Sequence, residues 1–193
     1  MFLETVQFLI KTIADLFVLV LLLRFYLQVA RAPFKHPLCQ FVMAATNFAV
    51  LPLRKLVPSL RGYDSATMLL AWLVSMVSSV IILAFNPMYT LAAPETWLAL
   101  SLLAILDVFK QSLTLLMGAV IVQAVLSWVN PYNPLSPILD ALTRPFLKPF
   151  RRATVGGVDL SPLILFLIIQ VVLMLPVQFL ENSFLMQLKV VMQ

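Results

Sequence analysis

The sequence has little charge. Only 11% of its 193 residues are Asp, Glu, Lys or Arg, against about 25% in a typical soluble domain. Hydrophobic residues make up 62% of the chain, and the mean hydropathy is +1.03. This composition excludes a soluble globular domain and predicts an integral membrane protein. Because about 20 apolar residues cross a bilayer as one helix, the length allows four crossings but no second, soluble domain.

Cysteine and histidine are present once each, as Cys39 and His36. One of each cannot form an intrachain disulfide, a CxxC pair or a Cys/His zinc site. The two residues are three apart and could act as nucleophile and base, but no third group orients them and no GxSxG element exists. His36 is also a single haem ligand, so a haem held by two histidines would need two subunits. The sequence predicts no enzyme activity, no cofactor and no metal site.

Four apolar segments are long enough to cross a membrane. They cover residues 6–29, 66–85, about 98–128 and about 162–180. The third is longer than a hydrocarbon core of roughly 30 Å requires, so we expect its start, around Asp107 and Lys110, to lie among the headgroups. Residues 181–193 are expected to form a short amphipathic tail.

Positive charge is concentrated in two of the connections. The stretch "RPFLKPFRR", residues 144–152, carries four cations. Nine of the 13 Lys and Arg residues lie in the two connections: Arg31, Lys35, Arg54, Lys55, Arg61, Arg144, Lys148, Arg151 and Arg152. The positive-inside rule predicts that both connections face the cytoplasm and that both termini lie outside it. The cations either only orient the chain or also bind anionic lipid headgroups.

The two basic connections resemble each other at a shift of 97 residues. The aligned sets are His36-Pro37-Leu38 with Asn133-Pro134-Leu135, Thr46 with Thr143, and Pro52-Leu53-Arg54-Lys55 with Pro149-Phe150-Arg151-Arg152. A two-residue deletion then aligns Gly62-Tyr63-Asp64 with Gly157-Val158-Asp159. We infer an internal duplication into two membrane repeats, residues 1–95 and 96–193. Because two crossings restore the original side, the repeats are expected to be parallel, unlike the inverted repeats of many transporters.

Each basic connection contains an apolar pattern of helical period. The expected apolar stripes are Leu38, Phe41, Val42 and Ala45 in the first repeat and Leu135, Ile138, Leu139 and Leu142 in the second. Cys39, Gln40, Ser136 and Asp140 fall on other faces. Pro37 and Pro134 are expected at the helix starts. Such helices either lie at the membrane interface or fold back on the spanning helices as core.

A Gly-x-Asp step follows each of these patterns. Gly62 and Asp64 in the first repeat, and Gly157 and Asp159 in the second, suit a tight turn followed by an acidic cap on the returning helix. We expect these residues to have a structural role.

Two pairs of charged residues fall inside the spanning segments. Lys11 and Asp15 are four residues apart, and Asp107 and Lys110 are three apart, so each pair is expected to share a helix face. Arg24 projects from the opposite side of its helix and cannot pair with Asp15. Ionisable groups inside membrane helices often mark ion paths. Alternatively, both pairs lie near the outer interface and reach water with their long side chains.

The duplicated pattern, above all "LTRPFLKPFRR" followed by "GGVDLSP" and its partner "VLPLRKLVPSLRGYDSA", resembles the YggT family of small bacterial and plastid membrane proteins. The resemblance covers nearly the whole length and implies two tandem repeats in a bacterial inner membrane. One departure is that Pro58 follows the first basic pair, as the family pattern favours, whereas the second copy has Ala153-Thr154-Val155. The family has no agreed biochemical activity. Roles proposed for it are osmotic or potassium homeostasis, division-site organisation and cytochrome assembly.

The sequence as a whole predicts an all-helical integral membrane protein with four transmembrane helices, arranged as two parallel repeats with interfacial amphipathic helices. We expect it to dock on the cytoplasmic leaflet and to organise lipids or membrane-protein assemblies. The alternative is ion or osmotic homeostasis as a transporter, channel component or regulator. The expected partners are anionic lipid and other membrane proteins or further copies of the chain, and nucleic acid is not expected.

Overall fold

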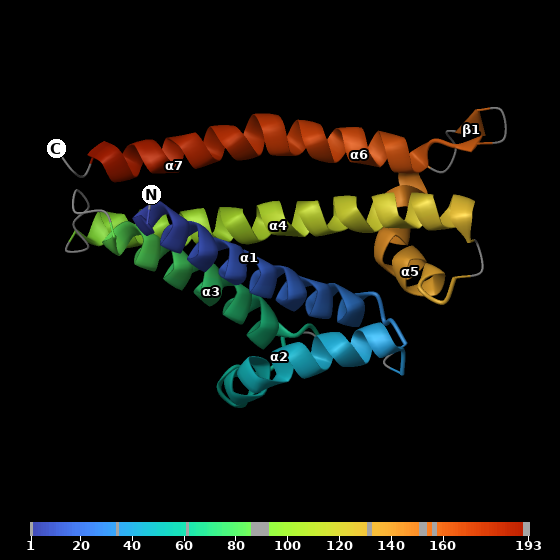
Figure 1. Ribbon diagram of the computed structural model, residues 1–193, viewed down its shortest axis with the longest axis horizontal. Helices are drawn as coiled ribbons and strands as arrows, with labels where there is room; N and C mark the ends of the chain where they lie inside the picture. The colour runs from blue at the N-terminus through green and yellow to red at the C-terminus, as the bar shows by residue number, and fades with distance from the viewer. Residues whose placement is uncertain are drawn as a thin grey trace.

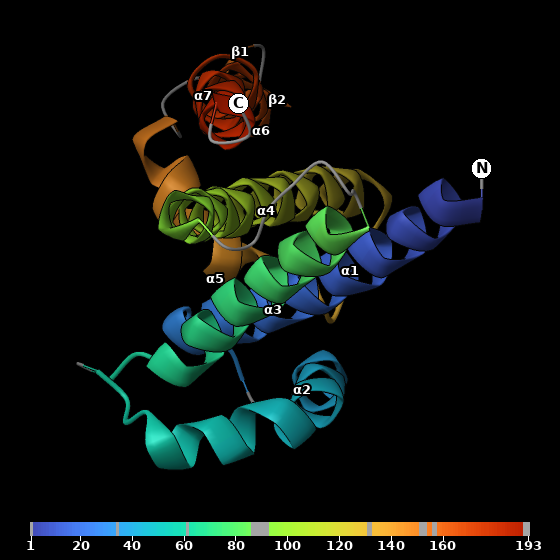
Figure 2. The ribbon, with the colours of Figure 1, turned by 90° about the vertical axis from the view of Figure 1, so that its left-hand side faces the viewer.

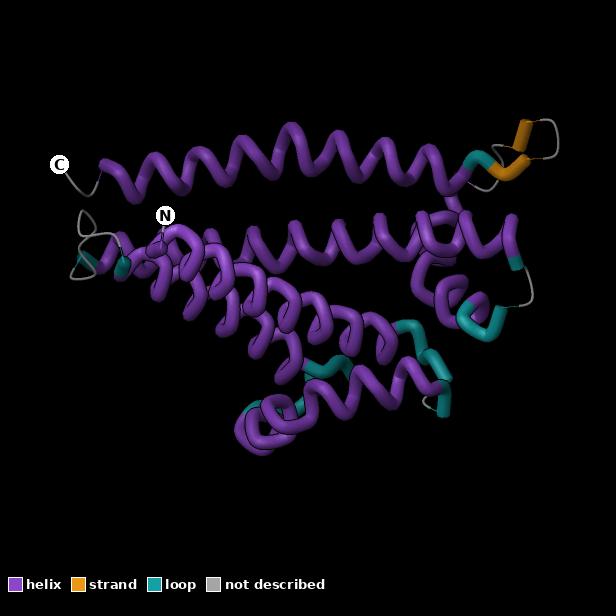
Figure 3. The backbone as a smooth tube through the Cα atoms, viewed as in Figure 1, coloured by secondary structure: helices purple, strands orange, loops and turns teal. Residues whose placement is uncertain are grey.

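The computed structural model describes residues 2–33, 35–60, 62–85, 93–130, 133–150, 154–155 and 158–190. The helices are α1 (Phe2–Val29), α2 (Pro37–Leu56), α3 (Ser65–Ala84), α4 (Pro94–Val129), α5 (Ser136–Leu147), α6 (Ser161–Val172) and α7 (Gln178–Val190). A 3-10 turn, η1 (Lys148–Phe150), follows α5, and a π-helical segment, η2 (Leu173–Val177), joins α6 to α7. Strands β1 (Thr154–Val155) and β2 (Val158–Asp159) form one short antiparallel hairpin. The part of the chain that the structure describes is therefore almost wholly helical (Figure 3).

Four helices are long and apolar enough to cross a membrane. They are α1, α3, α4 and the continuous helix Ser161–Met186, which runs from α6 through η2 into α7. The four predicted crossings are thus confirmed. The 20 residues of α3 extend about 30 Å, which matches one hydrocarbon core, whereas the 36 residues of α4 extend about 54 Å and project beyond it.

The spanning helices lie side by side in a fixed order. Helices α1 and α3 pack against each other, α4 lies beside them, and α6 and α7 cover the far side of α4 (Figure 2). A cluster of buried apolar residues joins the first three spanning helices to α2: Val18, Leu21, Leu22, Val50, Ala71 and Val108. The start of α1, the start of α4 and the end of α7 lie at one end of the molecule, and α5 with the β hairpin lies at the other (Figure 1).

Helices α2 and α5 meet near the end of α1. Leu27 and Ala32, from the end of α1 and just beyond it, form one buried cluster with Cys39 and Val42 of α2 and Ile138 of α5. The two basic connections are therefore at the same end of the molecule, and α1 and α4 run in the same direction. This confirms the parallel arrangement of the repeats.

Hydrogen bonds at the helix starts confirm the 97-residue alignment. His36 Nδ1 accepts a hydrogen bond from the backbone N–H of Leu38 at 3.2 Å, and Asn133 Oδ1 accepts one from Leu135 at 2.9 Å. Each side chain stabilises a helix start in the same way.

The shift of 95 residues after the deletion is also confirmed. Leu60 pairs with Tyr63 in an isolated antiparallel bridge, and Val155 pairs with Val158 in the β hairpin. Gly62, between the first two, has φ +83°, a left-handed conformation that glycine adopts without strain and that the expected tight turn requires. Its counterpart Gly157 lies outside the described residues.

Two bounds of the predicted elements were wrong. Helix α5 begins at Ser136, two residues after Pro134, although α2 does begin at Pro37. The last helix continues to Val190 rather than ending near residue 180, so residues 181–190, the described part of the expected tail, belong to it. Pro176 does not stop this helix because it lies in the π-helical segment, where a wider turn accommodates its ring and its missing N–H.

The buried face of α2 differs from the predicted stripe. Cys39, Val42, Thr46 and Val50 are buried, whereas Phe41 is 67% exposed. Cys39 was expected on another face than the apolar stripe, and Phe41 on the stripe itself, which was expected either at the membrane interface or in the core. The stripe of α5 agrees better, because Ile138 is buried and Leu139 and Leu142 are partly buried. Helix α2 therefore packs one face on the bundle and presents a second apolar face outward.

Candidate functional site

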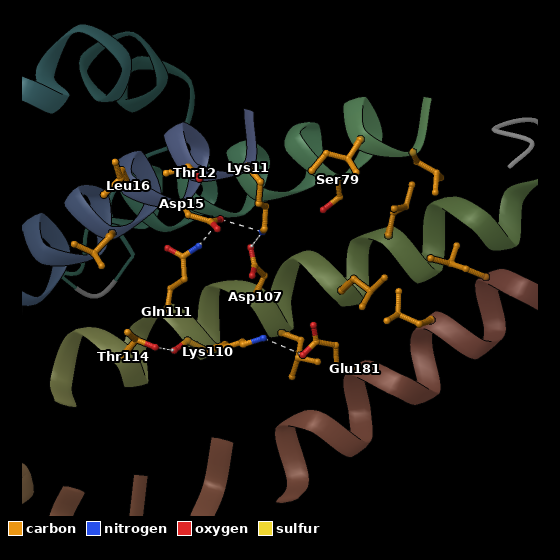
Figure 4. A pocket seen from close by; sticks show the side chains of 18 residues that line it. Lys11, Thr12, Asp15, Leu16, Ser79, Asp107, Lys110, Gln111, Thr114 and Glu181 are labelled. Atoms are coloured by element: carbon orange, nitrogen blue, oxygen red, sulfur yellow. Dashed lines mark hydrogen bonds and ion pairs between the residues drawn. The ribbon is translucent and has the colours of Figure 1, made fainter. Parts of the chain in front are cut away.

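A cleft of about 600 Å³ lies between α1, α3, α4 and α7 (Figure 4). Half of the residues that line it are leucine or isoleucine, and five ionisable side chains line it as well: Lys11, Asp15, Asp107, Lys110 and Glu181. We call it the polar cleft. Every helix that forms it is one of the four spanning segments, so its charges are placed where a bilayer would surround the protein.

The ammonium group of Lys11 is at the centre of the polar cleft. Its Nζ lies 2.9 Å from Asp15 Oδ1, one turn along α1, and 2.9 Å from Asp107 Oδ2 on α4. Ser75 of α3 donates a hydrogen bond to the same Asp107 oxygen at 2.7 Å. The predicted Lys11–Asp15 pair is therefore confirmed, and the structure extends it across two further helices.

Asp107 lies level with the middle of α3. Its partner Ser75 is the eleventh of the 20 residues of α3, a helix just long enough to cross the hydrocarbon core, so Asp107 is about 15 Å from either end of that helix. Asp107 and Lys110 were expected among the headgroups, and this position along α3 argues against it. The surplus length of α4 was assigned to its start, whereas the structure places much of it beyond α3 at the α5 end.

Lys110 does not pair with Asp107. Its Nζ lies 3.0 Å from Glu181 Oε2 of α7, because positions three apart on α4 differ by about 60° in direction and Asp107 faces α1 and α3. Instead of pairing with each other, Asp107 contacts Lys11 of α1 and Lys110 contacts Glu181 of α7. Glu181 was assigned to the tail. Continuing the fourth helix past residue 180 into the sequence that follows would have placed Glu181 on a spanning helix.

Gln111 completes the polar cleft. Its Nε2 donates a hydrogen bond to Asp15 Oδ1 at 2.9 Å, and its Oε1 is buried with no hydrogen-bond partner among the described residues. The polar cleft contains three carboxylates and two ammonium groups, so it carries one net negative charge. An unpaired carbonyl oxygen beside this charge favours a cation or another hydrogen-bond donor.

A second polar site joins α1, α2 and α3. Arg24 is only 8% exposed. Its Nη1 donates hydrogen bonds to Thr46 Oγ1 at 2.7 Å and to Asn47 Oδ1 at 2.8 Å, and its Nε lies 4.0 Å from Asp64 Oδ2. As predicted, Arg24 points away from Asp15. We call this the buried arginine site.

Asp64 supplies the carboxylate of the buried arginine site. It is 2% exposed and accepts hydrogen bonds from Arg54 and, at 2.7 Å, from Thr67 Oγ1. Burial alone would raise the pKa of this carboxyl, but the hydrogen bonds from Arg54 and Thr67 and the charge of Arg54 outweigh it, so the pKa lies below its usual value. Asp64 occupies the expected N-cap position of α3, without a side-chain capping hydrogen bond, and its carboxylate ties α3 to α2.

Asp159, the counterpart of Asp64 in the second repeat, has a simpler set of hydrogen bonds among the described residues. Its Oδ1 accepts hydrogen bonds from the backbone N of Ser161 at 2.8 Å and from Ser161 Oγ at 2.5 Å. These contacts stabilise the start of α6, which agrees with the predicted cap. Arg151, the counterpart of Arg54, lies outside the described residues together with Arg152.

The remaining basic residues of the two connections that the structure describes point to the surface. Lys55, Arg144 and Lys148 are exposed, and Arg54 keeps 42% of its side chain exposed. Four large apolar side chains of α2 are exposed as well: Phe41, Phe48, Leu51 and Leu56. Lys55 and Leu56 are neighbours, so cationic and apolar groups reach the surface together.

Cys39 and His36 serve packing and helix capping. Cys39 is 2% exposed and packs with Val42 and Ile138. Burial raises the pKa of its thiol, which disfavours the reactive thiolate. His36 Nδ1 is engaged by the N–H of Leu38.

The fold and the two polar sites define a polytopic helical membrane protein made of two parallel repeats. A family model described as CCB3/YggT matches residues 3–85 and 102–180, that is, the two repeats in turn. The chain belongs to the CCB3/YggT family.

Several relatives are similar over most of their length. The chain is 34% identical over 172 residues to a protein named YggT of Escherichia coli K12, with 88% of this chain and 87% of the relative covered. It is 35% identical over 170 residues to a Vibrio alginolyticus protein named for the proC 3' region, covering 86% and 90%. A Pseudomonas aeruginosa protein, PA0392, is 35% identical over 172 residues, covering 87% and 86%. All three are described as uncharacterised. No solved structure matches the chain.

Proposed function

We propose that this protein is a non-enzymatic membrane protein that docks on the anionic cytoplasmic leaflet of a bacterial inner membrane and organises lipids or membrane-protein assemblies there. The main support for this proposal is that α2 and α5 lie at the same end of the molecule and present exposed cations, Lys55, Arg144 and Lys148. Phe41 and Phe48 are exposed on the same α2. An amphipathic helix with this composition inserts its apolar face at the acyl boundary and holds its cations near phosphates.

The strength expected of this docking follows from its charges. Each basic residue near an anionic surface contributes about 1 kcal/mol, and the attraction is screened within a Debye length. Lys55, Arg144 and Lys148 together supply about 3 kcal/mol by this measure. The exposed aromatic residues of α2 add an apolar term that salt does not screen.

Hydrogen–deuterium exchange in nanodiscs tests the docking. Amides of residues 37–56 and 136–147 should exchange more slowly in nanodiscs that contain anionic lipid than in zwitterionic ones, and about 1 M salt should remove the difference because it shortens the Debye length to about 3 Å. The variant Lys55→Gln, Arg144→Gln, Lys148→Gln should lose most of the protection.

A charge-conserving variant, Lys55→Arg, Arg144→Lys, Lys148→Arg, is the matched control and should keep the protection. Equal exchange in both kinds of nanodisc would disprove leaflet docking. Whatever the exchange result, crosslinking and affinity purification from native membranes would identify which membrane proteins, including further copies of this chain, accompany it.

The polar cleft favours a second candidate, ion homeostasis. Lys11 and Asp107 lie level with the middle of α3, too far from either end for the snorkelling that would make them ordinary interface residues. Ionisable groups at this depth are costly and typically bind or conduct ions. The unpaired Gln111 Oε1 and the net negative charge of the polar cleft suit a monovalent cation or a proton.

Asparagine substitutions separate the two candidates. If the polar cleft conducts ions, Asp15→Asn with Asp107→Asn should abolish cation or proton flux into proteoliposomes, because Asn keeps the shape and removes the charge. Adding Lys11→Gln removes the cation that would otherwise stay unpaired. Glu95→Gln removes an acid from the exposed start of α4 and should leave flux unchanged. Unchanged flux in the cleft variants, at normal protein abundance, would exclude this candidate.

A further inference from the structure

A smaller cavity of about 150 Å³ adjoins the buried arginine site between α1 and α2. The described residues that line it are Arg24, Leu27, Gln28, Cys39, Val42, Met43 and Arg54. We call it the arginine cavity. Two of these side chains are cations and none is an acid, so the charge that faces the cavity has one sign.

The nearby carboxylate does not balance both arginines. Asp64 accepts a hydrogen bond from Arg54, and it lies 4.0 Å from Arg24 Nε. Two guanidinium groups therefore share one carboxylate, which leaves one positive charge in excess. Since Arg24 is only 8% exposed, this excess is held away from water, where an unpaired charge is costly.

The donors of both arginines are only partly used. Arg24 directs Nη1 to Thr46 and Asn47, and Arg54 directs Nη2 to Asp64. A guanidinium group has five N–H donors, so each arginine retains donors for a ligand in the cavity. Guanidinium groups match the geometry of phosphate oxygens, which they bind bidentately.

The size and walls of the arginine cavity narrow the choice of anion. A volume of about 150 Å³ equals that of about five water molecules, enough for one tetrahedral phosphate group. Leu27, Val42 and Met43 make the rest of the wall apolar, which suits the carbon side of a phosphate ester. The cavity is open toward the surface at Arg54, whose side chain is 42% exposed.

We propose that the arginine cavity binds one phosphate group, carried either by the headgroup of an anionic phospholipid or by a soluble phosphate ester. Arg24 and Arg54 hold its oxygens, and Gln28 can donate a further hydrogen bond. The lipid source rests on the proposed function, because it requires this end of the molecule to face headgroups. The soluble source does not.

The experiment uses the full chain, purified in detergent. Binding of dihexanoyl phosphatidylglycerol, of dihexanoyl phosphatidylcholine and of glycerol 3-phosphate is measured by native mass spectrometry and by ligand-dependent shifts of the apparent Tm. We expect one saturable phosphate ligand per chain. Binding of phosphatidylglycerol alone assigns the lipid source, and binding of glycerol 3-phosphate assigns the soluble one.

Three single variants test the site. Arg54→Gln removes one cavity cation and should weaken binding by about fivefold or more. Asp64→Asn breaks the same ion pair but frees both arginines, so it should bind at least as tightly as the wild type. Lys35→Gln makes the same charge change at an exposed residue of the same connection, outside the cavity lining, and should leave binding unchanged.

Opposite effects of Arg54→Gln and Asp64→Asn support the proposal, because loss of the ion pair alone would weaken both. Equal weakening in these two variants would overturn it. Equal weakening by Arg54→Gln and Lys35→Gln would also overturn it, while leaving general leaflet docking intact. Absence of any saturable phosphate ligand in the wild type would overturn the site, whereas docking is decided separately by the exchange experiment.

Discussion

At the scale of residues, Thr46 and Thr143 show how the two repeats differ. Each hydroxyl donates a 2.7 Å hydrogen bond to the carbonyl four residues earlier in its own helix, Val42 or Leu139. The hydroxyl of Thr46 also accepts a hydrogen bond from Arg24, whereas that of Thr143 shares its one hydrogen with a second acceptor, the side-chain amide oxygen of Gln123. The same position therefore supports a buried charge in the first repeat and a neutral group in the second.

A residue-scale prediction concerns Asp64. Its folded-state pKa is depressed below the ordinary value of 3.8, so the ionised form contributes stability that is fully present above that value and is lost as the pH falls through the lower, folded pKa. Below about pH 4 the apparent Tm in detergent should fall. Asp64→Asn should lower stability by about 2 kcal/mol at neutral pH and remove this part of the acid dependence.

Asp159→Asn is the matched control for that measurement. An amide oxygen can still accept both hydrogen bonds from Ser161, so we expect little change in the apparent Tm. If Asp64→Asn had an equally small effect at neutral pH and kept the same acid dependence, the ion pair with Arg54 would not stabilise the fold.

At the scale of elements, the sequence predicted the spanning helices well because length and hydropathy alone determine them. It did not show which face of α2 is buried. Hydropathy ranks Phe41 above Cys39 and Thr46, but an exposed phenylalanine costs nothing where lipid can cover it. Small residues such as Cys39 and Thr46 let helices approach closely. A helix face that is buried because its side chains are small cannot be recognised from the pattern of apolar residues.

The candidate sites were predictable only where the pairing is local. The Lys11–Asp15 pair follows from helical spacing. The contact of Lys11 with Asp107 joins residues 96 positions apart, and that of Lys110 with Glu181 joins residues 71 apart. Such contacts depend on which helices are neighbours and how each is rotated, and neither property is set by local spacing.

At the scale of the whole molecule, the parallel repeats give a topology prediction. The positive-inside rule places the α2 and α5 end in the cytoplasm. Reporter fusions after residues 60 and 155 should therefore read as cytoplasmic, and a fusion at residue 92 as external. Alkaline phosphatase and green fluorescent protein fusions, active on opposite sides, provide the measurement. The same compartment for residues 92 and 155 would contradict four crossings.

The common direction of α1 and α4 has an evolutionary consequence. Inverted repeats descend from an ancestor that had to insert both ways, with dual topology, before its gene was duplicated and fused. Here each half has its own basic connection, so two copies of a single-repeat ancestor would insert the same way. The end of α3 and the start of α4 lie at the same end of the molecule, so a linker that crosses no membrane is enough to fuse them. A parallel homodimer is therefore the simplest precursor of this chain, and gene fission between residues 85 and 94 would leave two halves with the orientation they have now.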